Sequence, residues 1–330
     1  MSVCLIINPI HQCGVTFLTE NHVEVRYASA PDMETVAREI EKVDAVVTRG
    51  AGLSKQAIAA APRLRVIGSH GVGVDAVDVK AATQYRIPVV NTPLANYQSV
   101  AEHTVTLMLA VARRLIEADH AARSGDTGFK ASADIRELYG KTIGIIGMGR
   151  VGARVAEMCK TAFGMHVVFY SPSANPTPFA RQGMEKLQKL EDLFLRADVI
   201  SIHVPLTAAT RDLIGFAQFA QMRKGAMLIN TSRGDVVDEA ALIEALRAGR
   251  IFGAGLDVVS RQNASGKEGV GQSELNSLRN VVMTPHIAAS THECLERTAM
   301  QTVTQVLDVL AGRRAQHLVN AEIWDERRRC

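Results

Sequence analysis

Short apolar runs alternate with amphipathic segments along the first hundred residues of the chain. The runs at 3–7, 22–27, 45–48, 64–68 and 88–90 are typical of buried strands. Helical patterns separate some of them, at 33–42 and 54–61. Alternation of this kind predicts a parallel α/β domain.

The same alternation resumes after a long helical pattern at 99–114. Further apolar runs lie at 143–146, 167–170, 199–204, 227–230, 252–257 and 281–284, with helical patterns at 190–196, 216–222 and 238–248. These six runs predict a second, doubly wound parallel sheet. A last helix, at about 294–310, has an apolar stripe that needs a partner, and we expect it to return to the first domain.

A glycine turn follows the first strand of this second sheet. The apolar run 143–146 ends at Gly147, and Gly147-x-Gly149-x-x-Gly152 leads into a segment with one apolar helical face. Gly147 allows a tight turn, Gly149 lets the backbone approach a phosphate, and Gly152 lets the helix and strand pack closely. Free N–H groups at the helix start can then receive negative charge. The motif therefore predicts a site for a dinucleotide pyrophosphate.

The acidic residue that usually follows this motif is absent. The next strand, 165–170, is followed by Ser171 where an NAD-specific site has Asp or Glu to bind the adenosine ribose. A carboxylate repels the 2′-phosphate of NADP, and a hydroxyl does not. Arg150 and Arg181 are the nearest candidates for binding that phosphate. The predicted cofactor is NAD or NADP, with NADP slightly favoured.

Length and composition narrow the class of protein. The chain has 330 residues, enough for two domains, and a net charge of +3 with both signs interspersed, so we expect no nucleic-acid partner. Its five cysteines form neither a CxxC pair nor a disulfide framework, and the sequence shows no secretory or membrane-spanning stretch. Potential metal ligands lack metal-site spacing. We expect a soluble, cytoplasmic protein without a metal site.

Three polar residues follow successive strands of the second sheet, at the positions where open α/β sheets bind ligands. Arg233 comes after 227–230, Asp257 ends 252–257, and His286 comes after 281–284. Each alone also suits a structural role in a salt bridge, cap or loop. Together, a guanidinium can bind an α-keto acid carboxylate bidentately, and an imidazolium can protonate the alkoxide formed from the keto group. The set indicates hydride transfer at a carbonyl beside a dinucleotide.

In these motifs the chain resembles the D-isomer-specific 2-hydroxyacid dehydrogenase family almost end to end. The matching segments are, in order, 69–75, 90–93, 100–104, 147–152, 203–206, 231–238, 255–258 and 284–287. The resemblance implies two Rossmann-like domains with an interdomain cleft: a flavodoxin-like substrate domain, residues 1–98 and 290–330, and an NAD(P)-binding Rossmann domain, residues 99–289. It also implies a homodimer formed through the cofactor domains.

The resemblance implies roles for individual residues. Arg233 is then the catalytic residue that binds the substrate, and His286 is the acid/base. The backbone of a loop would hold the substrate carboxylate, at His70, Gly71, Val72 and Gly73. The expected cofactor contacts are Thr104, Gly147, Gly149, Arg150, Val151, Gly152, Ser171, His203, Val204, Pro205, Thr210, Thr231, Ser232, Asp257, Ala288 and Ala289. The implied substrate is a small D-2-hydroxy acid or its 2-keto acid.

One catalytic position departs from the family pattern. Gln262 stands where the family has a Glu that raises the pKa of the catalytic histidine. A glutamine can orient the imidazole but adds no negative charge, although Glu268 on the same loop is an alternative source of it. Two other functions stay open. One is a dinucleotide-sensing, corepressor-like binding protein, and the other is hydride transfer like that of formate dehydrogenases, which also pair Gln with His.

Overall fold

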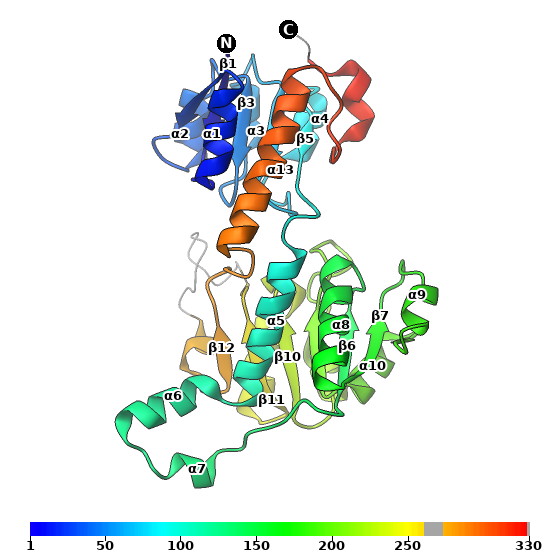
Figure 1. The fold of residues 1–330 in the computed structure, drawn as a ribbon. Helices are drawn as coiled ribbons and strands as arrows, with labels where there is room; N and C mark the ends of the chain where they lie inside the picture. The colour runs from blue at the N-terminus through cyan, green and yellow to red at the C-terminus, as the bar shows by residue number, and fades with distance from the viewer. Residues whose placement is uncertain (261–272, 329–330) are drawn as a thin grey trace. The chain divides into compact units, whose positions relative to one another are not determined.

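The computed structural model describes residues 1–260 and 273–328. The chain divides into two compact units: unit 1 comprises Met1–Asn96 and Ala289–Cys330, and unit 2 comprises Tyr97–Ala288. Each unit contains one parallel sheet flanked by helices (Figure 1). The predicted α/β fold class is therefore confirmed.

Unit 1 has a five-stranded parallel sheet in the order β2-β1-β3-β4-β5, which is the flavodoxin-like order. Its strands are β1 (Ser2–Ile6), β2 (Val23–Tyr27), β3 (Ala45–Thr48), β4 (Val66–Ser69) and β5 (Val89–Val90). Its helices are α1 (Gln12–Glu20), α2 (Met33–Glu39), α3 (Lys55–Ala59), α4 (Val79–Gln84) and α13 (His292–Leu310), and a 3-10 helix spans Ala321–Glu326.

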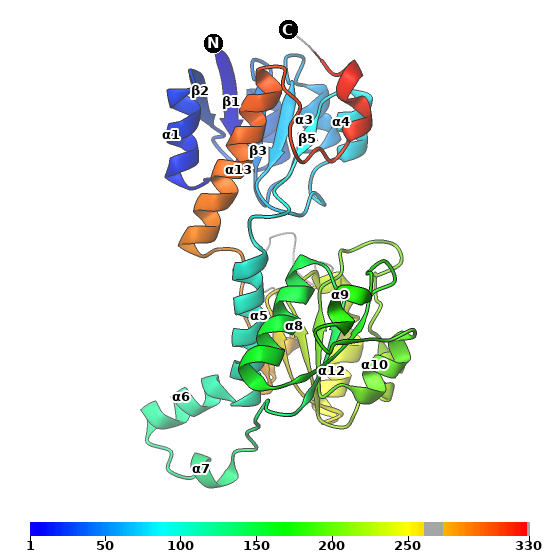
Figure 2. The same ribbon diagram turned by 45° about the vertical axis from the view of Figure 1, so that its right-hand side comes forward.

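The apolar stripe of α13 packs on the sheet of unit 1, as the sequence predicts. Val303 and Val306 share a buried cluster with Ile6 of β1, and α1 lies beside α13 on the same face (Figures 1 and 2). A Cβ atom at Gly68 of β4 would lie 2.8 Å from Val306. Glycine at that position therefore allows the helix to approach the strand closely.

Unit 2 has a seven-stranded parallel sheet in the order β12-β11-β10-β9-β6-β7-β8. Its strands are β6 (Thr142–Ile146), β7 (His166–Tyr170), β8 (Glu185–Lys186), β9 (Val199–Ile202), β10 (Ala226–Asn230), β11 (Ile251–Leu256) and β12 (Val281–Met283). Because later strands add on opposite sides of β6, the strand order reverses there. Doubly wound sheets bind ligands at the carboxyl ends of the strands beside such a reversal.

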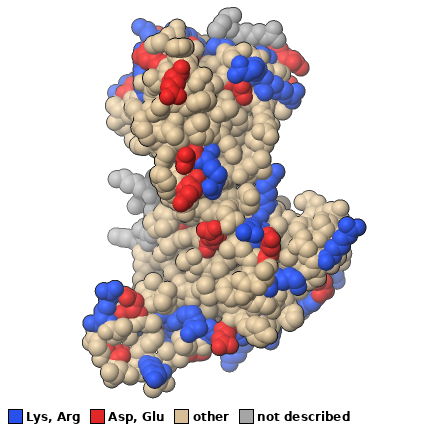
Figure 3. All heavy atoms as spheres, in the orientation of Figure 1, with Lys and Arg blue, Asp and Glu red and all other residues tan. Residues whose placement is uncertain are grey.

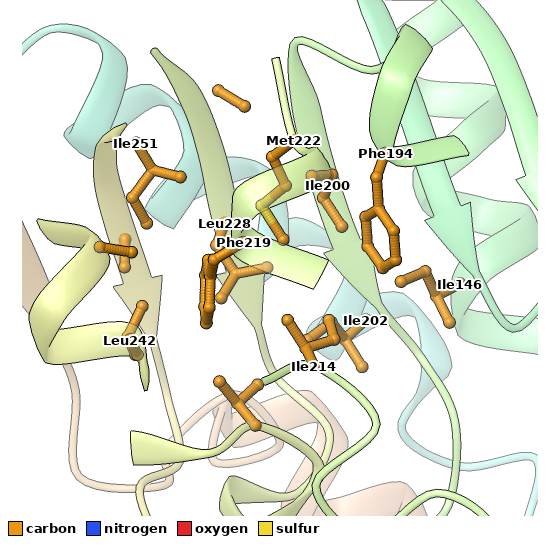
Figure 4. Packing of buried hydrophobic residues seen from close by; sticks show 14 of the residues in the cluster. Ile146, Phe194, Ile200, Ile202, Ile214, Phe219, Met222, Leu228, Leu242 and Ile251 are labelled. Atoms are coloured by element: carbon orange, nitrogen blue, oxygen red, sulfur yellow. The ribbon is translucent and has the colours of Figure 1, made fainter. Parts of the chain in front are cut away.

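The helices of unit 2 are α5 (Tyr97–Ala112), α6 (Leu115–Ser124), α7 (Phe129–Ser132), α8 (Arg150–Phe163), α9 (Thr177–Ala180), α10 (Leu190–Arg196), α11 (Phe216–Gln221) and α12 (Glu239–Arg247), with 3-10 turns at Gly234–Val236 and Glu274–Ser277. Helices α5 and α8 pack on one face of the sheet. Helices α10, α11 and α12 pack on the other, where Figure 4 shows Phe194, Phe219 and Leu242 against the strand residues Ile200 and Leu228.

The prediction of six strands was wrong by one. Strand β8 is a polar pair of residues, Glu185 and Lys186, that extends the sheet beyond β7 and gives no apolar run to recognise. The hydrophobic pattern also missed α6, α7 and α9: α6 buries only Ala121, and the four-residue helices α7 and α9 fully bury no side chain. No described helix is long and apolar enough to cross a membrane. Basic and acidic side chains are interspersed on the face shown in Figure 3.

Candidate active site

The glycine turn after β6 has the shape that its sequence predicts. Gly147 has a φ of +96°, and a Cβ there would lie 2.5 Å from the carbonyl oxygen of His203. A Cβ at Gly152 would lie 2.2 Å from the carbonyl oxygen of Gly147. A Cβ at Gly149 would meet no neighbouring described atom within 4 Å. Packing therefore explains two of the glycines, whereas the third borders open space.

Gly149 is also the N-cap residue of α8, and no described side chain caps that helix. The N–H groups of its first turn, which includes Arg150 and the partly buried Val151, can therefore bind an anion. A Cβ at Gly149 would fill the space through which such an anion approaches. The turn thus fits the pyrophosphate of a dinucleotide.

The loop after β9 lies against this turn. The backbone N–H of His203 donates to the carbonyl of Ile146 at 2.7 Å, and its ring hydrogen-bonds to Ser201 at 2.8 Å. Burial lowers the pKa of His203 to about 3, so the ring is neutral at physiological pH. After the partly exposed Val204, the Thr210 hydroxyl donates to the carbonyl of Pro205 at 2.6 Å and closes the loop. The cofactor contacts of this loop stay a prediction.

Ser171 is buried directly after β7. The following loop is held by Lys186 of β8, whose Nζ donates to the carbonyls of Ala174 at 2.7 Å and Pro172 at 3.4 Å. Arg150 and Arg181, the cations considered from sequence, are both exposed. Lys186 is thus a further cation beside the Ser171 loop. Sequence reasoning missed it because β8 itself was not predicted.

Asn230, the last residue of β10, organises the loop that carries Arg233. Its buried side-chain amide donates to the carbonyl of Arg233 at 2.9 Å, and its oxygen accepts from the N–H and hydroxyl of Ser232 at 2.9 and 2.8 Å. Thr231 is hydrogen-bonded to Thr104 of α5 at 2.9 Å. The partly buried Arg233 donates from Nη1 to the carbonyl of Ser232 at 2.8 Å. These bonds fix the backbone from which the guanidinium projects.

Asp257 organises the neighbouring loop, 284–288. Its carboxylate accepts from the Thr284 hydroxyl at 2.6 Å and from the N–H groups of Ile287 and Ala288 at 2.8 and 2.9 Å. Burial alone would raise the pKa of Asp257, but hydrogen bonds from His103, Thr284 and the two backbone N–H groups lower it below its usual value. The buried group is therefore a carboxylate at neutral pH.

His286 lies within this loop in the left-handed backbone region, with a φ of +55°. Its N–H points at the carbonyls of Asp257 and Thr284, at 2.9 and 3.0 Å, while the residue itself is exposed. The loops with Arg233, Asp257 and His286 follow β10, β11 and β12, which are neighbours in the sheet. The structure thus brings the three loops to one edge of the sheet.

His103 is a polar residue of this region to which sequence reasoning gave no role. It projects from α5 so that Nε2 lies 2.9 Å from the Thr284 hydroxyl and 3.4 Å from the Asp257 carboxylate. Its segment, 100–104, was recognised only as a family motif. Nothing local in the sequence marks a contact with a residue 181 positions away.

The predicted substrate loop of unit 1 follows β4. The Asn91 side chain donates to the carbonyl of Val72 at 2.8 Å, and the Ser69 hydroxyl donates to the carbonyl of Gly73 at 3.0 Å. Gly71 has a φ of +145°. His70 is buried, and its Nε2 has no hydrogen-bond partner among the described residues. Burial and, to a smaller degree, the charge of Arg49 lower the pKa of His70 to about 4.

The remaining predicted site residues fall at the boundary between the two units or outside the described residues. Ala288 is buried at the end of unit 2, and Ala289 is the first residue of the second segment of unit 1. Gln262 and Glu268 lie outside the described residues, so their predicted roles stay predictions. Within residues 1–260 and 273–328, no group of three or more His, Cys, Asp and Glu residues can hold a metal ion.

Comparison with known proteins identifies relatives along nearly the whole chain. Residues 105–288 match the profile of the D-isomer specific 2-hydroxyacid dehydrogenase, NAD binding domain. A D-3-phosphoglycerate dehydrogenase of Archaeoglobus fulgidus is 40% identical over 317 residues, which are 96% of this chain but 59% of that relative. A glyoxylate reductase of Aeropyrum pernix is 40% identical over 300 residues, 89% of this chain and 88% of the relative. The chain thus spans little more than half of the first relative and most of the second.

Solved structures share the fold, and they include one complex with NAD and one with NADPH. The D-lactate dehydrogenase of Aquifex aeolicus, complexed with NAD and lactic acid, is 31% identical with a TM-score of 0.83, over 96% of this chain and 99% of that one. An acyclic imino acid reductase in complex with NADPH and D-Arg is 28% identical with a TM-score of 0.85, over 97% and 100% of the two chains. The prediction of NAD or NADP as cofactor is confirmed at this level of detail.

Proposed function

This chain belongs to the D-isomer-specific 2-hydroxyacid dehydrogenase family, and we propose that it interconverts a small D-2-hydroxy acid and its 2-keto acid with NAD or NADP. The observation that carries the proposal is the common edge of the sheet at which Arg233 and His286 follow β10 and β12. Asp257 braces the backbone between them. The glycine turn before α8 opens at the carboxyl end of β6 in the same sheet.

Each residue has a distinct task in the proposed reaction. The Arg233 guanidinium binds the substrate carboxylate with two parallel hydrogen bonds and draws electron density from the neighbouring keto group. In reduction, His286 as imidazolium gives a proton to the oxygen that becomes the hydroxyl; in oxidation, neutral His286 takes that proton away. A reduced dinucleotide, when bound, supplies the hydride for the keto carbon, and its oxidised form accepts one from the hydroxy acid.

Glutamine at position 262, in place of the family's glutamate, affects the rate of this reaction more than the kind of reaction. A glutamine orients an imidazole without stabilising its charged form, so His286 would be a weaker proton donor at neutral pH unless Glu268 supplies a carboxylate. For the cofactor, Ser171 together with the cations Lys186, Arg150 and Arg181 supports acceptance of NADP.

A homodimer through unit 2 is part of the same proposal. Helices α6 and α7 project from the sheet of this unit as an arm (Figure 1). Leu115 and Ile116 on the arm are 55% and 61% exposed, and Ile116 lines a cavity of about 840 Å³ whose walls combine apolar residues such as Phe252 with charged ones such as Arg114 and Arg279. A second copy would cover the exposed side chains of Leu115 and Ile116. Ile116→Asp should therefore yield a monomer in sedimentation, whereas Leu195→Asp, equally exposed on α10, should not; a monomeric wild type would refute the dimer.

The activity is tested with a panel of 2-keto acids and each reduced cofactor. Arg233→Ala should lower kcat/KM by about a hundredfold or more, because a charge-assisted bidentate contact is lost. Arg233→Lys should recover only part of this loss, since lysine has the charge without the planar fork. The control is Arg223→Ala, because Arg223 precedes the same strand, at its opposite end, and pairs with Asp198. Turnover by Arg233→Ala at the wild-type rate would overturn the assignment.

A further inference from the structure

One face of α5 holds the loop 284–288 at both of its ends. The Ser99 hydroxyl donates to the carbonyl of Ala288 at 2.6 Å, and His103, one helical turn later, hydrogen-bonds to the Thr284 hydroxyl at 2.9 Å. His286 lies between these two attachments. The helix therefore contacts the loop on either side of the residue to which we assign proton transfer.

The direction of the hydrogen bonds follows from counting protons. The Thr284 hydroxyl has one proton, and at 2.6 Å it donates that proton to Asp257. The contact between His103 and Thr284 must then run the other way, with Nε2–H of His103 as the donor. The Asp257 carboxylate, 3.4 Å from the same nitrogen, also favours a proton there. His103 thus bears a proton on Nε2, whether its ring is neutral or charged.

The conformation of His286 depends on this network. A left-handed backbone is uncommon for a residue other than glycine, and it persists where surrounding contacts determine it. Here the contacts are the two N–H groups and the hydroxyl held by Asp257, with His103 closing the remaining side of Thr284. His103 itself is only 17% exposed, so water has limited access to replace its hydrogen bond.

We propose that His103 is a positioning residue that keeps His286 in place by clamping the Thr284 hydroxyl against the Asp257 carboxylate. The inference rests on the proposed function, in which His286 transfers the proton. His103 acts only through the loop, and its own ring takes no part in the chemistry. The donor atom is what matters, so a different side chain that places an N–H at the same point should serve nearly as well.

Two substitutions of His103 distinguish the role of its N–H donor from any role of the imidazole ring. His103→Leu removes the donor and should lower kcat by about ten- to a hundredfold, the effect of losing one hydrogen bond to a charged network. KM for the keto acid and the dissociation constant of NADH or NADPH should change far less. His103→Gln, whose Nε2 can reach the same place, should restore kcat to within a few fold of the wild type. His166→Leu is the matched control, because His166 is an exposed histidine of the same unit.

A double-mutant cycle with His286→Gln tests whether His103 acts through His286. Adding His103→Leu to His286→Gln should cost little further activity, because the group that it positions is already gone. If the two losses multiply in full, or if His103→Leu leaves kcat unchanged, the proposal is wrong. His103→Gln keeps the test valid should His103→Leu unfold.

A spectroscopic measurement separates this inference from the proposed function. The ring signal of His286, identified by its absence in His286→Gln, should shift and titrate differently in His103→Leu but stay near the wild-type position in His103→Gln and His166→Leu. If the wild type reduces no 2-keto acid and the signal moves as expected, the proposed function fails while the positioning role stands. An unmoved signal refutes the positioning role whatever the activity.

Discussion

Replacing Gly149 and Gly152 by alanine should separate the two reasons for glycine in the turn after β6: open space for a bound anion at Gly149, and close packing of helix on strand at Gly152. Gly149 has φ −79° and ψ −163°, a conformation open to alanine, and its new Cβ would meet no described atom within 4 Å. At such a site the substitution stabilises a fold by about 0.4–1 kcal/mol through the unfolded chain. Gly149→Ala should therefore melt at or slightly above the wild-type temperature, yet bind the dinucleotide at least about tenfold more weakly, because the methyl group occupies the approach of the pyrophosphate.

Gly152→Ala meets the opposite constraint. Alanine is the better helix former by about 1 kcal/mol, but its Cβ would lie 2.2 Å from the Gly147 carbonyl oxygen and 3.0 Å from Ile145. Helix α8 must then move away from β6, and such overpacking costs typically ~1–3 kcal/mol, or more against rigid backbone. Because the closest contact is with backbone, we take about 2–3 kcal/mol for the overpacking; the helix gain of about 1 kcal/mol then leaves a net loss of roughly 1–2 kcal/mol, or about 2–8 °C in Tm for a unit of this size.

Thermal melting without cofactor and calorimetric titration with NADH and NADPH measure the two effects separately. Gly215→Ala is the control, since Gly215 is also an N-cap residue of unit 2 and its Cβ would have only ordinary contacts at 3.7 and 3.9 Å. Gly149→Ala should be stable but bind the dinucleotide poorly, whereas Gly152→Ala should be destabilised. Gly149→Ala with wild-type affinity, or Gly152→Ala with wild-type Tm, would refute the corresponding half of the argument.

Three further predictions concern charge. Ser171→Asp should shift the NADH-to-NADPH ratio of kcat/KM toward NADH, since a carboxylate accepts ribose hydrogen bonds and repels a 2′-phosphate; an unchanged ratio would remove Ser171 from the ribose site. Because burial lowers the pKa of His203 from 6.5 to about 3, the unfolded chain binds a proton that the fold excludes, so stability should fall as the pH drops through this window, by up to about 1.4 kcal/mol per pH unit. In denaturant titrations at several pH values, the free energy of unfolding of His203→Gln should fall less steeply with decreasing pH than that of the wild type. Equal pH dependence in the two proteins would contradict this prediction. Gln262→Glu should move the falling limb of the reduction pH profile upward, whereas a strong loss of reduction in Glu268→Gln would show that this residue already supplies the charge; profiles that move in neither variant would exclude both.

The sequence was informative wherever a short-range pattern reflects burial. Buried parallel strands require continuous apolar runs, so β6 and β10 are visible in the chain, and their carboxyl ends must share an edge. This logic alone places Arg233 and His286 at one end of a sheet. It fails at β8, which is polar, and at α6, α7 and α9, which fully bury at most one side chain each, because no apolar pattern marks such elements. Lys186 was missed together with its strand.

The supports of the site were beyond sequence reasoning for a different reason. His103 and Thr284 are 181 residues apart, and Thr104 and Thr231 are 127 apart, so each pair is defined only once the sheet has formed. The pattern identifies a residue's place on a helix or after a strand, but not its hydrogen-bond partner. Tertiary contacts of this kind decide how the loops are held.

The bracing of the loops that carry Arg233 and His286 comes mainly from two buried polar side chains at neighbouring strand ends. Asn230 ends β10 and supports the Arg233 loop, Asp257 follows β11 and supports the His286 loop, and the N–H of Asp257 donates to the carbonyl of Asn230 at 2.9 Å. Each is about 1% exposed, so removing either leaves several donors and acceptors unsatisfied in the interior, at about 1–3 kcal/mol for each group. Arg233 and His286 are more exposed. Loss of stability should therefore follow substitution of the bracing residues, whereas under the proposed function substitution of Arg233 or His286 should lower turnover with little unfolding.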